Sequence, residues 1–309
     1  MKKLDSVDDL MRRFSIDYSY FVIDFVKGEE FSKSEDKPYP IWSCFKLAVL
    51  IALFEDLSSE GELYEKVKIS ENQLVDAGGW LLQIGGSIEL TWLQLAKLVL
   101  VASDATAADL ILSRVGLDKV EKVMQRSAPS STLPLDTGDM VRGFMKTLDP
   151  TLIKTLEWSC DSIENLVRDC CRLGKTTAKD LAHLVTTVFQ FKPPNGLRNA
   201  YLQLIEAEQS LTQKRTRSFL APPLMCFGKG GSMGYSFLLN DCGVFYELDG
   251  RDPIMAFGFC LAGVRLSSLQ AEHLCGVIGL ELARAFDLPV QYNIDWSSEV
   301  EALYAVNAG

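Results

Sequence analysis

Ser43 and Lys46 combine residue types and a spacing that suit nucleophilic catalysis. Ser43 stands near the start of the apolar run "IWSCFKLAVLIALF", residues 41–54, and Lys46 follows it by three positions. Residues three apart share one face of a helix, so the lysine amine can reach the serine hydroxyl. Burial would lower the pKa of the amine and let it act as a base, and the helix N-terminus would stabilise negative charge near the serine.

A structural interpretation of the same pair stays open, in which Ser43 caps the helix and Lys46 extends its stem to solvent. The Ser-x-x-Lys spacing also occurs at Ser34 and Lys37, in a charged loop where the lysine would stay solvated. Spacing alone is therefore weak evidence, and the local sequence favours the structural interpretation.

Two later segments place further polar groups in apolar surroundings. Ser103 and Asp104 lie between the apolar stretches "TWLQLAKLVLVA" and "TAADLIL", where they also fit a helix cap. Lys229 lies inside the apolar pattern "CFGKGGSMGYSF" and is followed by Gly230 and Gly231, where the backbone can approach a ligand closely. Taken alone, this segment also fits a glycine-weakened edge strand with a solvated lysine.

The composition disfavours several classes of function. The chain has 309 residues, of which 48% are hydrophobic, so it can bury a sizeable core. Its net charge of -10 argues against nucleic acid or an anionic membrane surface as the main partner. The start "MKKLDSVDDLMRRF" has acidic residues where a secretory signal needs an apolar segment, and no apolar run is long enough to span a bilayer. We therefore expect a cytoplasmic globular protein.

The cysteines and histidines limit the kinds of catalytic site that the chain could form. Eight cysteines are scattered without a metal-ligand pattern, so we expect reduced thiols and neither a metal nor a cofactor. The two histidines, His183 and His273, lie in helical apolar contexts that suit packed or surface residues. A general base would then be a lysine or a carboxylate.

Hydrophobic periodicity predicts strands at both ends of the chain and helices in its middle. Residues 18–31 alternate and break at Lys27 and Gly28, as in a β-hairpin. Helical patterns cover 43–57, 91–103, 106–116, 176–191 and 268–286. Three short antiparallel strands are predicted within 225–263, separated by turns at 240–241 and 249–250.

These elements predict an α/β (α+β) fold of two lobes. One lobe would hold an antiparallel sheet, built from both chain ends and flanked by helices, and would comprise residues 1–42 and 195–309. An inserted all-helical lobe would comprise residues 43–194. The active site of such a protein is expected in the cleft between the lobes.

In their order and contexts, the three polar segments resemble the signature of the class A β-lactamases and other penicillin-recognising serine enzymes, which is Ser-x-x-Lys, Ser-Asp-Asn and Lys-Thr-Gly. "PYPIWSCFKLAVLIAL" is similar to the first active-site helix of that family, and "IELTWLQLAKLVLVASDATAADLIL" to the next two. "TTAKDLAHLV" looks like its mid-domain helix and "GKGGSMGYSFLLNDCGVFY" like its strand and hairpin. The resemblance covers most of the chain, accounts poorly for residues 127–173, and implies a β-lactamase/transpeptidase-like fold.

The resemblance also implies a role for each matching residue. Ser43 would be the acylated nucleophile, Lys46 its base, and Ser103 a carrier of the proton toward the leaving group. Lys229 would supply positive potential that keeps Lys46 neutral and attracts a polar or anionic substrate group. The backbone amides of Ser43 and Ser232 would form the oxyanion hole.

The chain departs from the family pattern at positions expected to contact substrate, which are Asp104, Ala105, Gly230 and Gly231. Ala105 replaces the asparagine of Ser-Asp-Asn, and Gly230 replaces the threonine of Lys-Thr-Gly. An amide and a hydroxyl that hold a β-lactam substrate are therefore missing.

The family's Glu-x-x-Leu-Asn loop, whose glutamate activates water for deacylation, also has no clean copy. Glu157 and Glu164 fall in roughly the right region, although a solvent-facing helical acid is the favoured interpretation of each.

The sequence thus predicts a serine acyl-enzyme catalyst that acts as a hydrolase or transacylase on a small non-β-lactam ester or amide. An amine or alcohol would be the acceptor in a transfer reaction, and a role in specialised metabolism fits a cytoplasmic address. The alternatives are a genuine β-lactamase with degenerate motifs, a non-catalytic binding protein on the same fold, and, more weakly, a side-chain glutaminase on a related fold. The oligomeric state cannot be predicted.

Overall fold

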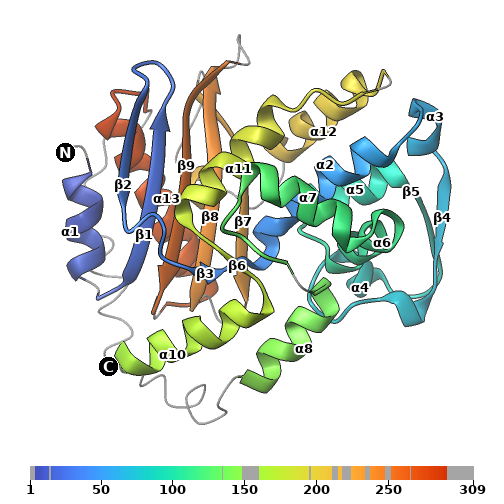
Figure 1. The fold of residues 1–309 in the computed structure, drawn as a ribbon, viewed down its shortest axis with the longest axis horizontal. Coiled ribbons are helices and arrows are strands. Elements are labelled where there is room, and N and C mark those ends of the chain that lie inside the picture. Colours follow the sequence, from blue (N-terminus) through green and yellow to red (C-terminus); the bar gives the residue numbers. More distant parts are fainter. Residues whose placement is uncertain are drawn as a thin grey trace.

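A five-stranded antiparallel sheet forms the centre of the protein (Figure 1). The computed structural model describes residues 4–13, 15–133, 135–147, 160–194, 196–210, 215–217, 224–233, 237–247, 252–264 and 266–290. The strand order is β2-β1-β9-β8-β7, so strands from both ends of the chain pair, as the sequence predicts. Their bounds are Asp17–Asp24 for β1, Glu29–Lys33 for β2, Leu224–Met233 for β7, Leu238–Glu247 for β8 and Pro253–Ala262 for β9.

The predicted hairpin at the start of the sheet is confirmed. β1 and β2 pair antiparallel from Tyr20 opposite Lys33 to Asp24 opposite Glu29. Gly28 closes the turn with a φ of 68°, a value in the left-handed region that glycine adopts without steric penalty.

The predicted turn at 240–241 is wrong, because Asn240 and Asp241 lie inside β8 and pair with Cys260 and Phe259. Both side chains are buried and bonded. Asn240 Nδ2 donates to Pro40 O at 2.6 Å, and Asp241 Oδ2 accepts from the backbone N–H of Thr216 at 3.0 Å. Residues typical of turns serve here as tertiary anchors, a role that local sequence does not reveal. The other predicted turn, at 249–250, lies outside the described residues.

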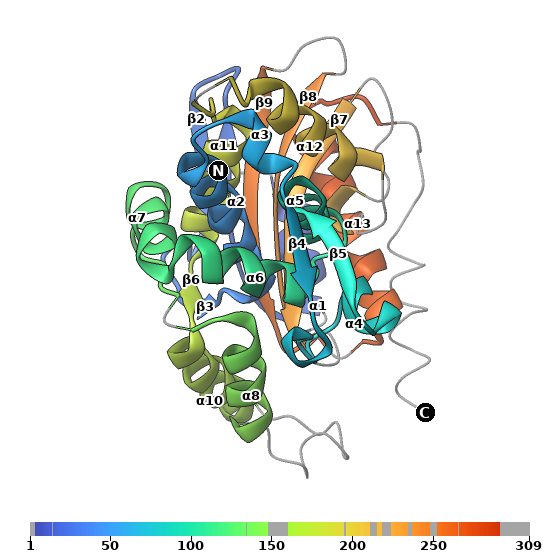
Figure 2. The same ribbon diagram turned by 90° about the vertical axis from the view of Figure 1, so that its right-hand side faces the viewer.

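Helices cover both faces of the sheet, and Figure 2 shows α13 and α11 on opposite sides of it. On one face, α13 (Ser268–Ala285) and α1 (Asp5–Arg13) share one apolar cluster with the strands. On the other, α11 (Ala178–Gln190) packs against β1, β8 and β9. The predicted helices near 176–191 and 268–286 are thus confirmed.

The remaining helices gather on the α11 side. They are α2 (Lys46–Asp56), α3 (Glu60–Leu63), α4 (Trp80–Ile84), α5 (Trp92–Val101), α6 (Ala105–Val115), α7 (Leu117–Ser127), α8 (Thr137–Thr147), α10 (Cys160–Cys170) and α12 (Arg198–Ser210). Short 3₁₀ turns are η1 (Trp42–Phe45), η2 (Glu71–Gln73), η3 (Cys171–Leu173) and η4 (Arg215–Arg217). Two small ribbons join β3 (Tyr39–Pro40) to β6 (Lys175–Thr176) and β4 (Lys66–Ile69) to β5 (Ile88–Thr91).

α2 lies in the middle of these helices and carries the site residue Lys46. It packs against α5, α6, α7 and α11. Its residues from Lys46 to Phe54 are all buried, which explains why this part of the sequence is apolar on all sides. The helices predicted at 43–57, 91–103 and 106–116 appear as η1 with α2, α5 and α6.

None of the described helices is both long enough and apolar enough to span a bilayer.

Gly258 on β9 allows α11 to lie close to the sheet. A Cβ atom at this position would lie 2.1 Å from Ala178 O, which is backbone and cannot move without shifting the helix. We expect Gly258→Ala to lower the free energy of unfolding by roughly 1–3 kcal/mol, as overpacking does in other cores. Urea unfolding followed by circular dichroism measures the change.

Gly61→Ala is the matched control, because the nearest atom to a Cβ there is the Ser59 hydroxyl at 3.7 Å and Gly61 lies within α3. It should leave stability unchanged or raise it by up to about 1 kcal/mol. Equal stabilities of the two variants would contradict the close packing of α11 on β9.

Candidate active site

Ser43 lies in η1, the 3₁₀ turn that leads directly into α2, and its side chain is partly exposed. The residues at the N-cap positions of η1 and α2 are Ile41 and Phe45, and neither helix has a side-chain cap. Lys46 is only 1% exposed. The interpretation of this pair as a helix cap and a solvated lysine is therefore wrong on both counts.

The backbone before Ser43 is held in an unusual conformation. Trp42 has a φ of 43°, in the left-handed region where a bulky side chain is strained. The neighbouring chain is fixed from the sheet, because Asn240 Nδ2 donates to Pro40 O and, at 3.4 Å, to Ile41 O. The serine is thus presented by a turn that tertiary contacts hold in place.

Lys46 contacts the loop between α5 and α6. Its Nζ donates to Ser103 O at 2.5 Å and lies 3.5 Å from Ser103 Oγ. Burial of the amine, together with the positive charge of Lys229, lowers the pKa of Lys46 to about 7, while Asp104 and Asp109 oppose the shift. Near neutral pH, a large fraction of Lys46 is therefore an uncharged amine that can accept a proton.

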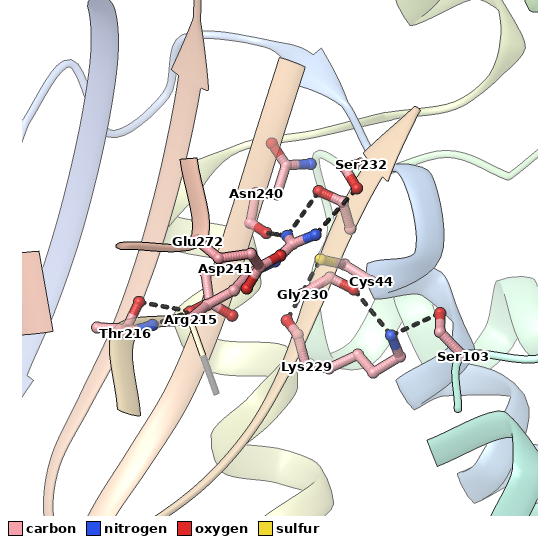
Figure 3. A network of polar contacts seen from close by, with 11 residues as sticks. Cys44, Ser103, Arg215, Thr216, Lys229, Gly230, Ser232, Asn240, Asp241 and Glu272 are labelled. Atoms are coloured by element: carbon pink, nitrogen blue, oxygen red, sulfur yellow. Dashed lines mark hydrogen bonds and ion pairs between the residues drawn. The ribbon is translucent and has the colours of Figure 1, made fainter. Parts of the chain in front are cut away.

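Ser103 links the two buried lysines. Lys229, 3% exposed on β7, donates from Nζ to Ser103 Oγ and to Gly230 O, both at 2.8 Å (Figure 3). Because Lys229 donates to Ser103 Oγ, the Ser103 hydroxyl can in turn donate its proton toward neutral Lys46. Ser103 holds this position with a φ of 52°, another non-glycine residue in the left-handed region. Three distant segments of the sequence thus meet at Ser103, and Lys46 lies three residues along the chain from Ser43.

β7 passes close to the N-terminal end of η1 at Gly231. A Cβ atom on Gly231 would lie 3.0 Å from both Ser43 N and Trp42 Cβ, so glycine permits this approach. Ser232 follows on the same strand and is exposed. The backbone amides of Ser43 and Ser232 therefore belong to adjoining segments, and their role as an oxyanion hole stays a prediction.

Asp104 serves as a structural anchor rather than as a group open to substrate. Its Oδ1 accepts from Ala107 N in the first turn of α6, and its Oδ2 accepts from Leu81 N in the first turn of α4, both at 2.9 Å. Asp104 and Ala105 are each fully buried. One carboxylate therefore caps two helices, and the capping interpretation made from the sequence holds for Asp104 but not for Ser103.

The segment that Asp104 holds is short and bounded by glycines. Gly78, Gly79, Gly85 and Gly86 flank α4 and all have positive φ values. A Cβ on Gly79 would lie 2.9 Å from Asp104 Cα, so the α4 segment packs directly on the backbone of Asp104.

Arg215 is a site residue that sequence reasoning missed. It is 4% exposed, and its guanidinium lies across β7 and β8 (Figure 3). Nη1 donates to Gly231 O at 3.1 Å and to Asn240 O at 2.7 Å, and Nη2 donates to Ser232 Oγ at 2.9 Å. Nε pairs with Glu272 Oε1 of α13 at 2.9 Å. The surrounding residues, "QKRTRS", are typical of a solvated basic loop and do not indicate that Arg215 is buried.

The Arg215 guanidinium fills the space above Gly230. A Cβ on Gly230 would lie 2.6 Å from Nη1 and 2.7 Å from Cζ. The threonine of the family's Lys-Thr-Gly is therefore absent here, and the Arg215 side chain occupies the space next to Gly230 where a threonine side chain would begin.

Glu164 lies away from this group. It is exposed on α10 and lines a cavity of about 350 Å³ with Asp17, Lys37, Lys175 and others, none of which is Ser43, Lys46, Ser103 or Lys229. Glu157 lies outside the described residues.

Among the residues that are described, no group of three or more His, Cys, Asp or Glu side chains could hold a metal ion. Seven of the cysteines are described as free thiols.

The buried amine of Lys46 makes stability depend on pH. Its pKa is about 7 in the fold and 10.5 in the absence of the fold. Between these values the unfolded chain binds more protons, so the free energy of unfolding should rise as the pH increases from about 7 to about 10.5. We expect Lys46→Met to remove this dependence and to stabilise the protein at pH 7 by roughly 1–4 kcal/mol.

Urea unfolding at pH 7 and pH 9 tests this expectation, with Lys97→Met on α5 as the control because Lys97 is partly exposed. A Lys46→Met variant that is less stable than the wild type at pH 7 would show that the amine stabilises the fold.

The contact between Arg215 and Gly230 leads to a second prediction, about packing. Gly230→Thr should lower the free energy of unfolding by roughly 1–3 kcal/mol, because the guanidinium must move. In an Arg215→Met background the same substitution should cost clearly less, and thermal unfolding of the four proteins of this cycle measures the coupling. Additive effects would mean that the guanidinium does not occupy this space.

Comparison with known proteins identifies the family and the fold. The model of the Beta-lactamase enzyme family matches residues 3–286. The structure is similar to the β-lactamase from Sphaerobacter thermophilus DSM 20745, with 18% identity, a TM-score of 0.70, and coverage of 93% of this chain and 98% of that chain. It is also similar to an ancestral class A β-lactamase, with 18% identity, a TM-score of 0.71, and coverage of 92% and 100%. No curated protein matches the sequence.

A third similar structure is the class A β-lactamase from Mycobacterium abscessus, with 17% identity, a TM-score of 0.67, and coverage of 92% of this chain and 99% of that chain. At these identities the structures establish the shared fold, and the family match extends over nearly the whole chain. The family match supports a serine hydrolase that works through an acyl-enzyme, on a fold shared with these β-lactamases. The chain belongs to the β-lactamase enzyme family.

Proposed function

We propose that this protein forms an acyl-enzyme on Ser43 from a small non-β-lactam ester or amide and passes the acyl group to an amine, an alcohol or water. The observation that carries the proposal is the Ser103 hydroxyl, which lies between the buried amines of Lys46 and Lys229. Two buried lysines would be costly to the fold without a use for them.

Acylation follows from these contacts in balanced steps. Neutral Lys46 takes the Ser43 hydroxyl proton as Oγ bonds to the substrate carbonyl carbon, whose π electrons move onto oxygen. The amides of Ser43 and Ser232 stabilise this oxyanion. When it collapses, the bond to the leaving group breaks, and the leaving group takes a proton from Ser103. Lys46 returns its proton to Ser103 and is neutral again, and the reverse sequence with an acceptor releases the acyl group.

The substrate-binding positions argue against a typical β-lactam. Ala105 has no amide and is buried, and the space above Gly230 is filled by Arg215. The groups for proton transfer are retained while two groups expected to hold a β-lactam are absent. This pattern supports the same chemistry on a different acyl donor.

The carboxylates considered for activating water give little support for hydrolysis, which favours transfer of the acyl group to an amine or alcohol. Asp104 is next to Ser103, but both of its carboxylate oxygens accept hydrogen bonds from backbone N–H groups. Glu164 lines a different cavity. An acyl-enzyme that water attacks slowly can be discharged by an amine or alcohol, so we include transacylation in the proposal. The net charge of -10 and the proposed cytoplasmic location suit a small-molecule donor.

Intact-protein mass spectrometry tests the proposal with a fluorophosphonate, a penicillin and a panel of activated esters. We expect the wild type to gain a stable mass increase from the esters, at a rate that rises with pH around pH 7 as Lys46 loses its proton. Added amines should discharge the adduct faster than water does. Ser43→Ala should gain no mass.

Ser34→Ala is the control, since Ser34 has the same spacing to a lysine but lies in an exposed loop. It should be acylated like the wild type. Rapid turnover of penicillin would favour a genuine β-lactamase, and the lack of an adduct with every probe would favour a binding protein.

A further inference from the structure

The cavity of about 350 Å³ beside α10 is separate from the site around Ser43. Glu164, Val167 and Arg168 line it from α10, at spacings of three and four that place them on one face of the helix. Lys175 lines it from β6, and α10 itself packs against β3, the partner strand of β6 (Figure 1). Since each water takes up about 30 Å³, the cavity has room for roughly ten waters or a ligand of similar size.

An ion pair within the wall leaves three charges available to a ligand. Lys37 Nζ donates to both carboxylate oxygens of Asp17 at 2.7 Å, so these two residues neutralise each other. The other charged side chains of the wall are Glu164, Arg168 and Lys175, and all three are exposed. The cavity therefore offers one carboxylate and two cationic groups.

The carboxylate and the ammonium group of this cavity do not pair with each other. In the part of the chain that the structure describes, neither Glu164 nor Lys175 forms an ion pair or a side-chain hydrogen bond. Arg168 is only weakly paired, because its Nε lies 3.5 Å from Asp169 Oδ1 and Arg172 lies equally close to the same oxygen. Groups of opposite charge that line one cavity without pairing can bind the two ends of a zwitterion.

The rest of the wall carries no charge. Val167 and Pro38 contribute apolar surface. Burial raises the pKa of the Cys171 thiol to about 11, although Lys175 opposes the shift, so this thiol is neutral near pH 7. Such a surface suits a small apolar side chain on the ligand.

We propose that this cavity binds a small zwitterion of the α-amino-acid class, with its ammonium group on Glu164 and its carboxylate on Lys175 and Arg168. An apolar side chain of the ligand would lie against Val167 and Pro38. The proposal goes beyond the acyl-enzyme chemistry and does not depend on it, because none of the residues assigned to that chemistry lines the cavity. It gives Glu164 a role in binding in place of the activation of water.

Isothermal titration calorimetry near pH 7 tests the proposal with leucine and two analogues that each lack one of its charges. 4-Methylpentanoate has the same carbon skeleton without the amine, and 3-methylbutylamine lacks the carboxylate. We expect saturable binding of leucine with a Kd below about 10 mM. Each analogue should bind at least about fivefold more weakly, because one ionic contact is lost.

Two variants locate the ligand. Glu164→Gln should weaken the binding of leucine at least about fivefold without weakening that of 4-methylpentanoate, which has no ammonium group. Lys175→Met should weaken both. The matched controls are Asp161→Asn and Arg172→Met, because these residues are also exposed and charged, on α10 and η3, but do not line the cavity. Both controls should keep the Kd of the wild type, and thermal unfolding reports whether each variant is folded.

The absence of saturable leucine binding up to about 10 mM would overturn the proposal. So would analogues that bind as tightly as leucine, or controls that weaken binding as much as the cavity variants do. A Kd that is unchanged in Glu164→Gln and Lys175→Met would mean that leucine binds elsewhere on the protein. None of these results bears on the acylation of Ser43, so this proposal and the proposed function can fail separately.

Discussion

Burial of the Lys46 amine is the constraint on which the rest of the site depends. An isolated ammonium group in the core is unfavourable, and the fold responds by depressing its pKa and by supplying the Ser103 carbonyl as an acceptor. Lys229 adds a second positive charge on the other side of Ser103, which makes the charged form of Lys46 still less favourable. The stability lost in burying the two lysines is what prepares one of them to take a proton.

Polar residues far apart in the sequence hold this arrangement together. Asn240 ties the chain before Ser43 to β8, and Arg215 crosses from η4 to the backbone of β7 and β8. Asp241 in turn accepts a hydrogen bond from Thr216, which fixes the turn that carries Arg215. Each of these side chains is buried and bonded to backbone groups, so each couples two elements with directional contacts that apolar packing alone would not provide. The sheet and η1, the turn that carries Ser43, therefore keep their relative positions.

Local patterns predicted the elements of this fold better than they predicted its polar contacts. Alternation of apolar and polar residues predicted the hairpin of β1 and β2, and helical periodicity predicted α2, α5, α6, α11 and α13. In these segments the side chains that face the core recur with the period of the strand or helix. The pair Asn240 and Asp241 led to a wrong prediction of a turn. Asparagine and aspartate favour turns, but within a strand their side chains can form hydrogen bonds with distant partners instead. Arg215 was missed because burial of a guanidinium depends on acceptors in β7, β8 and α13, which no window of sequence contains.

The meeting of Lys46, Ser103 and Lys229 could be predicted because each belongs to a short motif in a distinctive sequence context. What the motifs could not reveal is which of their members faces solvent. Ser43, Ser103 and Ser232 are at least partly exposed, whereas Asp104, Ala105, Gly230 and Gly231 are buried. Membership of a motif thus says little about contact with a ligand.

Asp104 illustrates the difference between a residue that is needed and one that reacts. Its single carboxylate closes the first turns of both α4 and α6, and its backbone is the continuation of Ser103. Any replacement would free two helix ends at once and disturb the serine beside it. In a mutational scan scored only by activity, a loss at this position would therefore report on the architecture of two helices and not on a chemical role of the carboxylate.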